Sequence, residues 1–275
     1  THLVGLRLKA LFGLQWWADF RDPWSDIFYN KDFYRTSWAK KKDVRWEQKV
    51  LQNADGILTT VGGSLVQKFK INAPDQKFYV LPNGYDEALM SSIPKTKLNI
   101  FHVVYTGLLT DNQDYIPVMK ALNDIAEHRT IRLSLAGNIS DHILENIRKT
   151  APKMDLDYKG YLTHKEAIAL MKSGDLLLNF IFIGADQDMI SGKLLEYLAS
   201  EVPVLSIGNP QSEAGKLLNL ASFAQMIDAK DSHAQKSFIQ EAIQQTGKDR
   251  NTMPDIQKWS RENIAVTLSN LLDKG

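Results

Sequence analysis

The feature that most constrains the fold is a regular alternation of short apolar segments with amphipathic segments, which runs from Phe101 onward. Each apolar segment is bounded by Gly, Asn, Asp or Pro, as expected for buried strands. The intervening segments are helical in pattern, as in 116–128. This alternation predicts an α/β fold with a parallel, doubly wound sheet. The predicted strands are 101–106, 131–136, 156–161, 176–183, 202–207 and 223–227.

The first 95 residues follow the same pattern over a shorter length. Strands are predicted at 15–18, 56–61 and 78–81, and helices at 43–53 and 64–70. These elements amount to about half of a Rossmann-like domain. The run Ile93-Pro94-Lys95 separates the two blocks, so we expect domains over 1–95 and 96–255. A terminal helical segment, 256–275, has no strand after it.

Composition excludes several classes of protein. A net charge of +1 over 275 residues argues against a nucleic-acid-binding protein. The absence of cysteine excludes disulfides, a thiolate nucleophile and cysteine-ligated zinc, and it fits a reducing cytoplasm. The six histidines are scattered without paired ligand spacing, so we expect no metal site.

Charge and aromatic residues are concentrated in the first domain. Residues 1–95 carry a net charge of +4, whereas the remainder carries −3. The aromatic residues of 16–38 run directly into Lys40-Lys41-Lys42. One interpretation is that the uneven charge arises by chance and that the aromatic rings pack in the interior of the domain. The alternative is a patch that meets an anionic membrane surface.

The most informative segment, 186–198, follows a predicted strand and opens a helix. Ser191 is a suitable N-cap residue, and Lys193 falls in the first turn, where a cation is unfavourable unless an anion binds. Glu196 lies three residues later on the same face. A phosphate on the helix start and a ribose on Glu196 would fit this arrangement. The alternative is an ordinary solvated Lys and Glu on a surface helix.

These residues also carry a resemblance to a known family. Asp188 and Glu196 have an acidic-x7-Glu spacing, and the strand that follows opens with Pro203. This resembles the signature of the retaining family 4 (group 1) glycosyltransferases, which have the GT-B fold. Further segments match that family in order: Asp19-Phe20-Arg21-Asp22-Pro23-Trp24, Pro82-Asn83-Gly84 with Asp86, Tyr105-Thr106-Gly107, and Leu135-Ala136-Gly137.

The resemblance implies two Rossmann-like domains of GT-B type that face a cleft. Residues 96–255 would bind the nucleotide-sugar donor, and 256–275 would pack back toward the first domain. Residues 1–95 would be the C-terminal half of the acceptor-side domain. That first domain is expected to be incomplete, because the family's N-terminal strands should precede residue 1.

The resemblance also assigns roles around the donor helix. Lys193 would bind the donor diphosphate, and Glu196 the ribose hydroxyls. Asp188, with the backbone of Ile190, Ser191 and Gly192, would face the transferred sugar.

Other implied site residues lie in loops. Gly107 would let its loop approach the phosphates, because it has no Cβ. The backbone of Gly160, Tyr161 and Leu162 would lie against the nucleobase. Arg21 and Asp22 would face the cleft from the first domain and, with Lys193 and Asp188, would form the catalytic set.

The implied activity is transfer of a hexosyl group from a nucleoside-diphosphate sugar to a hydroxyl acceptor, a glycan or lipid-linked glycan. It would proceed with retention, without metal or cofactor, in polysaccharide or glycoconjugate biosynthesis. The cytoplasm, with peripheral contact to the inner face of a membrane, is the expected location.

Two departures from the family pattern affect this interpretation. No cation follows Gly107 until Lys120, where the family usually has an Arg, and residue 188 is Asp rather than Glu. The alternative function is therefore a catalytically weakened relative that binds a nucleotide or a partner. A NAD-type Rossmann protein is disfavoured, because no G-x-G-x-x-G follows a strand.

Overall fold

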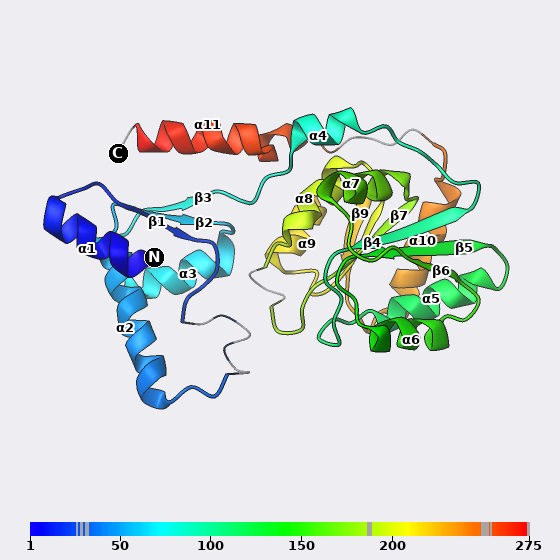
Figure 1. Ribbon diagram of the computed structural model, residues 1–275, viewed down its shortest axis with the longest axis horizontal. Helices are drawn as coiled ribbons and strands as arrows, with labels where there is room; N and C mark the ends of the chain where they lie inside the picture. The colour runs from blue at the N-terminus through cyan, green and yellow to red at the C-terminus, as the bar shows by residue number, and fades with distance from the viewer. Residues whose placement is uncertain are drawn as a thin grey trace. The chain divides into compact units, whose positions relative to one another are not determined.

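The computed structural model describes residues 1–25, 27, 30, 33–185, 189–248, 253 and 255–273. The chain divides into two compact units, Thr1–Asn83 with Ile264–Gly275 and Gly84–Asn263 (Figure 1). The second unit is thus inserted within the sequence of the first. It begins earlier than the expected boundary at residue 95, because helix α4 (Glu87–Ser92) and the residues after it bury Met90 and Ile93 in the second unit's core.

The second unit is built on a six-stranded sheet in which all neighbouring strands are parallel. The strand order β6-β5-β4-β7-β8-β9 places the first strand of the unit in the middle and extends the sheet to both sides. The predicted doubly wound topology is therefore confirmed. The strands are β4 (Phe101–Thr106), β5 (Ile131–Ala136), β6 (Asp155–Tyr158), β7 (Leu176–Phe180), β8 (Val204–Ile207) and β9 (Ala224–Ile227).

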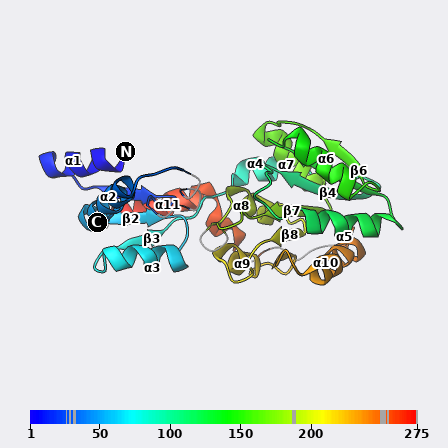
Figure 2. The same cartoon turned by 90° about the horizontal axis from the view of Figure 1, so that it is seen from below.

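Helices cover both faces of this sheet. On one face, α5 (Ile116–Ala126) and α10 (Ser232–Gln244) lie side by side (Figure 2). Helix α6 (Asp141–Thr150) packs against α5 on the same face. The opposite face is covered by α7 (His164–Ser173), α8 (Gly192–Ala199), α9 (Glu213–Leu218) and α4. Alternate strand residues enter the two cores: Val103 and Tyr105 pack into one, and Val104 into the other.

The predicted strand ends differ where the chain leaves the sheet. Strands β4 and β5 have the predicted limits, but β6 ends before residue 161 and β7 before residue 183. Beyond β6, Gly160 has a φ of 65°, a left-handed conformation that ends an extended segment. Beyond β7, the N–H of Ile183 donates to the carbonyl of Asn112 in a neighbouring loop, 2.9 Å away.

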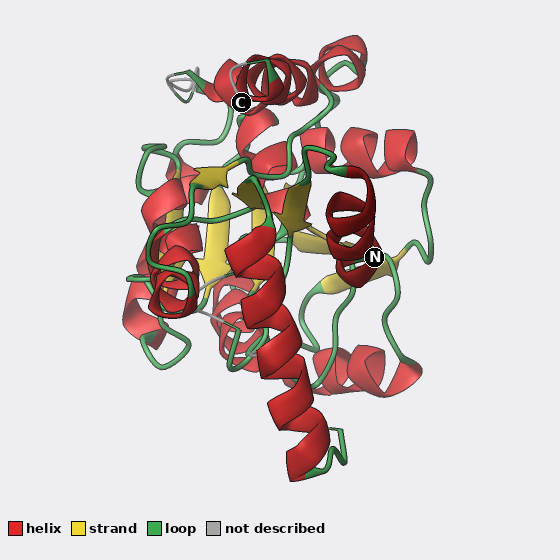
Figure 3. Cartoon of the chain, turned by 90° about the vertical axis from the view of Figure 1, so that its left-hand side faces the viewer, coloured by secondary structure: helices red, strands yellow, loops and turns green. Residues whose placement is uncertain are grey.

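The first unit contains a three-stranded parallel sheet of order β1-β2-β3, with β1 (Trp17–Phe20), β2 (Gly56–Thr59) and β3 (Phe78–Val80). The prediction of a strand at 15–18 was wrong by two residues. Helix α2 (Ser37–Asn53), the long helix in front in Figure 3, starts earlier than the predicted residue 43. The reason is that Thr36 caps it by accepting a hydrogen bond from Ala39 N. Helices α1 (His2–Phe12), α3 (Gly63–Asn72) and most of α11 (Arg261–Leu272) complete this unit.

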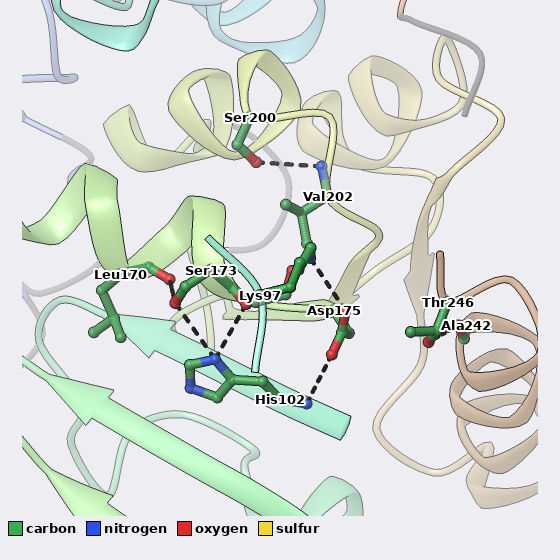
Figure 4. Close-up of polar contacts among 10 residues, drawn as sticks. Lys97, His102, Leu170, Ser173, Asp175, Ser200, Val202, Ala242 and Thr246 are labelled. Atoms are coloured by element: carbon green, nitrogen blue, oxygen red, sulfur yellow. Dashed lines mark hydrogen bonds and ion pairs between the residues drawn. The ribbon is translucent and has the colours of Figure 1, made fainter. Parts of the chain in front are cut away.

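A buried polar cluster lies near the start of β4 (Figure 4). His102 Nε2 lies 2.8 Å from Ser134 Oγ, and its Nδ1 lies 3.2 Å from the carbonyl oxygen of Ser173. Asp175 accepts a hydrogen bond from His102 N and pairs with Lys97 at 3.1 Å. Burial lowers the pKa of His102, because the charged imidazolium loses hydration there. The cluster is therefore a satisfied polar element of the core.

Among the described residues, no helix combines the length and the apolar character needed to cross a membrane.

Candidate functional site

Three glycines line the carboxyl edge of the second unit's sheet. Gly107, Gly137 and Gly160 follow β4, β5 and β6 with φ values of 128°, 121° and 65°. Gly137 N donates to the carbonyl of Gly160 at 2.8 Å, and a Cβ on Gly137 would lie 2.2 Å from Gly107 O. Only glycine fits at residue 137, where the two backbones stack closely, and this edge of the sheet is where α/β proteins bind ligands.

Helix α8 points its N-terminus toward this edge, since Lys193 in its first turn contacts the end of β4. Ser191 is the N-cap residue, as predicted, but its side chain makes no capping hydrogen bond. Within the described part of the chain, the N–H groups of Gly192 and Lys193 have no acceptor. Unsatisfied N–H groups at a helix start, together with the positive end of the helix dipole, form an anion-binding position.

Lys193 lies directly over the glycine edge. Its Nζ donates to the carbonyl of Thr106 at 2.7 Å and lies 3.1 Å from the hydroxyl of Tyr105 and 4.2 Å from the centre of its ring. A Cβ on Gly107 would lie 2.3 Å from this nitrogen, so a side chain there would displace the end of Lys193 from its present position. Desolvation lowers the pKa of Lys193 to about 7. Among the described residues no carboxylate pairs with it.

Tyr197, one turn further along α8, fixes the helix to the end of β4. Its hydroxyl accepts a hydrogen bond from Thr106 N at 2.9 Å and lies 3.1 Å from Thr106 Oγ1. Burial raises the pKa of Tyr197 to about 12, so the phenol stays protonated. Sequence reasoning did not assign this role, because an apolar helix face gives no sign of a bond to a distant strand.

Glu196 lies on α8 near the start of α7. Its side chain is 13% exposed, and its Oε1 lies 2.8 Å from His164 Nε2 and 3.9 Å from Arg261 Nη2. The loop that leads into α7 contains Gly160, Tyr161 and Leu162, with Tyr161 90% exposed. The structure thus brings Lys193, Glu196, Gly107 and this loop into one unit, on neighbouring strand and helix ends.

The other predicted site residues include Asp188, Ile190, Arg21 and Asp22. Asp188 lies outside the described residues. Ile190 packs against the core of the second unit. Arg21 and Asp22 follow β1 in the first unit, where both are exposed and Arg21 pairs with Asp19 and donates to Asn83. A role for these residues beside the α8 helix stays a prediction.

The loop after β4 carries no cation between Gly107 and Tyr115. It is tied to its neighbours instead: Leu109 N donates to Asn138 O at 3.2 Å, and Gln113 Nε2 donates to Phe180 O at 2.8 Å. Phosphate binding at this edge would therefore depend on Lys193 and on backbone N–H groups. In the described ranges, no group of three or more acidic or histidine side chains could hold a metal ion.

No family model matches the sequence, and no curated protein sequence matches it. Solved structures do match the fold. Sucrose-phosphate synthase from Thermosynechococcus elongatus aligns with a TM-score of 0.71 at 15% identity, over 99% of this chain and 71% of that protein. HepE from Anabaena, in complex with UDP, aligns with a TM-score of 0.73 at 14% identity, over 100% of this chain and 76% of HepE.

A third similar structure is TarM from S. aureus, in a complex with fondaparinux, α-GlcNAc-glycerol and UDP. It aligns with a TM-score of 0.57 at 14% identity, over 86% of this chain and 48% of TarM. All three are glycosyltransferases of the GT-B fold. The expected fold class is therefore confirmed: the chain is an α/β protein with parallel Rossmann-like sheets of the GT-B type.

Proposed function

We propose that this protein is a glycosyltransferase that takes a hexosyl group from a nucleoside-diphosphate sugar, and that the second unit binds this donor. The observation that carries the proposal is Lys193, a desolvated lysine above an edge of glycines. It lies beside N–H groups at the start of α8 that have no acceptor among the described residues. The HepE structures in complex with UDP and with UDP-glucose support a nucleotide-sugar donor.

In this proposal the diphosphate lies on the α8 N-terminus. Lys193 exchanges its bond to the carbonyl of Thr106 for a charged bond to a phosphate oxygen. As the bond from the sugar to the diphosphate breaks, negative charge develops on the departing group, and Lys193 with the helix N–H groups stabilises it. The ribose hydroxyls bind Glu196, and the base lies against the backbone of Gly160, Tyr161 and Leu162.

The proposal also covers the family, the residues that face the sugar, the acceptor and the need for a metal. Membership of the retaining family 4 rests on the spacing of Asp188 and Glu196, and Asp188 would face the sugar with Arg21 and Asp22. The acceptor would be a hydroxyl of a glycan or lipid-linked glycan, in polysaccharide or glycoconjugate biosynthesis in the cytoplasm. A metal would not be needed, because Lys193 and the helix dipole neutralise the diphosphate.

Calorimetric titration with UDP, GDP, ADP and TDP tests the donor site. Lys193→Ala should weaken binding about ten- to hundredfold, the loss expected for one charged hydrogen bond of about 1.5–3 kcal/mol. Lys165→Ala is the matched control, since Lys165 holds the same position in the first turn of α7. Equal affinities for the wild type and Lys193→Ala, with unchanged circular dichroism, would contradict the phosphate site.

A catalytically weakened relative is the second candidate function. It is favoured by the absence of a cation between Gly107 and Tyr115, since a second charged contact to the leaving group would be missing. Sugar-nucleotide turnover separates the two. Nucleotide binding without hydrolysis or transfer, across several donors and acceptors, would support the binding module.

We also propose peripheral contact of the first unit with an anionic membrane. On α2, Trp38, Lys41, Lys42, Arg45 and Lys49 are all exposed and follow helical spacing along one face. Trp38 is 71% exposed and lies under Lys42 Nζ, 4.9 Å from the ring centre. Lysine and arginine contribute about 1 kcal/mol each near an anionic leaflet, and tryptophan favours the interface.

Sedimentation with vesicles checks this contact. Vesicles rich in phosphatidylserine should retain the protein at low salt and release it as salt rises. Lys41→Glu with Lys42→Glu should abolish sedimentation, whereas Lys120→Glu with Lys149→Glu, the same charge change on the second unit, should not. Equal sedimentation with neutral vesicles would rule out the electrostatic contact.

A further inference from the structure

Two side chains from distant parts of the sequence, those of His164 and Arg261, contact Glu196. His164 Nε2 lies 2.8 Å from Glu196 Oε1, and Arg261 Nη2 lies 3.9 Å from the same oxygen. Within the described part of the chain, Glu196 Oε2 has no hydrogen bond. The carboxylate therefore has one oxygen occupied by the protein and one oxygen left for another donor.

His164 owes its position to the start of α7. Thr163 and Glu166 form a capping box, in which Glu166 Oε2 accepts from Thr163 N at 2.8 Å and Thr163 Oγ1 accepts from Glu166 N at 3.3 Å. The capping box fixes the first turn of α7, and His164 is the first residue of that turn. The loop of Gly160, Tyr161 and Leu162 leads directly into it. One short segment thus carries both the loop proposed for the base and the donor to Glu196.

Arg261 reaches Glu196 from a different part of the sequence. Its backbone N–H donates to Tyr85 O at 2.9 Å, and its Nε donates to Gly84 O at 3.1 Å, so the start of α11 is fixed to the segment before α4. Arg261 stands in the first turn of α11, where the helix dipole disfavours a cation unless an acid is near. Asp86 at 4.0 Å and Glu196 at 3.9 Å supply that acid.

We propose that His164 and Arg261 are positioning residues for Glu196, which they orient so that its Oε2 accepts hydrogen bonds from the two ribose hydroxyls of the nucleotide. This inference rests on the proposed donor site and deepens it. Neither residue needs to touch the nucleotide, since each acts by fixing the carboxylate that does. We expect His164 to affect nucleotide affinity more than Arg261 does. The contact of His164 with Glu196 is a short hydrogen bond, whereas the contact of Arg261 is longer and the Arg261 side chain is more exposed.

The test measures calorimetric affinity for UDP and for 2′,3′-dideoxyuridine 5′-diphosphate, which lacks both ribose hydroxyls. His164→Ala should weaken UDP binding about tenfold and leave binding of the dideoxy nucleotide unchanged. His164→Gln should restore most of the loss, because its amide nitrogen lies near the place of Nε2. Arg261→Ala should give a smaller loss, about threefold, with the same selectivity for UDP.

A double-mutant cycle with Glu196→Ala completes the test. His164→Ala should add nothing to Glu196→Ala if it acts only through that carboxylate. Equal losses for the two nucleotides, or additive effects in the double variant, would overturn the positioning role while the donor site stands. A wild-type protein that binds none of UDP, GDP, ADP and TDP would overturn the proposed function as well.

Discussion

The two units share one pattern of strands and helices but differ in how much of it they bury. The second unit covers a six-stranded sheet on both faces, and every residue of β4, β7 and β8 is buried. The first unit has three strands, and its helix α1 buries no residue. Val4, Leu8, Leu11 and Phe12 follow helical spacing along α1, and all four are exposed. The same αβ pattern therefore supports a large core in one unit and a small one in the other.

This contrast predicts that the two units differ in their free energy of unfolding. Hydrophobic burial is the dominant favourable contribution to folding, so the second unit should hold most of the stability. Tryptophan provides a convenient probe: five of the six lie in the first unit, and Trp259 lies in the second. Fluorescence therefore reports mainly on the first unit, whereas far-UV circular dichroism reports on both.

The largest expected effect comes from the core of the second unit. Leu178 is 0% exposed on β7, and Leu178→Ala should lower the free energy of unfolding by about 2–5 kcal/mol. Urea unfolding by circular dichroism should show the shift, and the tryptophan transition should stay in place. Leu11→Ala, at an exposed position of α1, should change stability by less than about 0.5 kcal/mol. A joint shift of both probes would mean that the units unfold as one block.

Substitution at the glycine edge should lower the free energy of unfolding almost as much as substitution in the core does. Gly137→Ala would place its Cβ 2.2 Å from Gly107 O at a φ of 121°, and should cost about 2–4 kcal/mol by strain and displaced backbone. Gly247 has a φ of 80° with open space around it, so Gly247→Ala should cost only about 1–2 kcal/mol. Thermal unfolding of the two variants measures the difference, and equal costs would argue against a crowded edge.

Nucleotide affinity should depend on pH through Lys193. Its pKa is lowered to about 7 in the free protein, and a bound diphosphate should raise it again. Binding then takes up a proton, so affinity should fall by up to about tenfold per pH unit above pH 7. Calorimetry in buffers with different ionisation enthalpies detects this uptake. Lys193→Arg should remove the dependence, because arginine stays charged. Proton release on binding would contradict the mechanism.

The smallest effect should come from His102. Burial holds its pKa below that of an unfolded histidine, so between the two values the unfolded chain binds more protons than the folded one. Stability of the second unit should therefore fall as pH is lowered from 7.5 toward 5.5. Urea midpoints by circular dichroism measure this slope, and His102→Gln should flatten it. A midpoint that rises on acidification would contradict the assignment.

Local patterns predicted much of the second unit. The limits of β4 and β5, the capping box at Thr163 and the N-cap position of Ser191 were all confirmed, because each depends on neighbours in the sequence. The start of α2 was missed, because the charged residues after Thr36 hide the apolar periodicity that marks a helix.

The site could be predicted only in outline. The sequence pointed to Lys193 and Glu196, because both stand on one helix that follows a strand. The contacts that hold them were not predictable: Tyr105 and Thr106 meet Lys193 from 88 and 87 residues away, and His164 meets Glu196 from 32. Such pairings depend on which strands and helices become neighbours, and spacing along the chain does not encode that choice.

The insertion of the second unit gives it a particular kind of independence. The chain enters it at Gly84 and leaves it at Asn263, and close to these points Tyr85 and Ser260 pair in a parallel bridge. A folded module whose two ends already meet can be cut out or transplanted without stretching its own backbone. Residues 84–263 therefore form a unit whose two ends lie close together in space. On the proposed function, exchange of this unit between related chains would change the donor, while residues 1–83 keep their sequence.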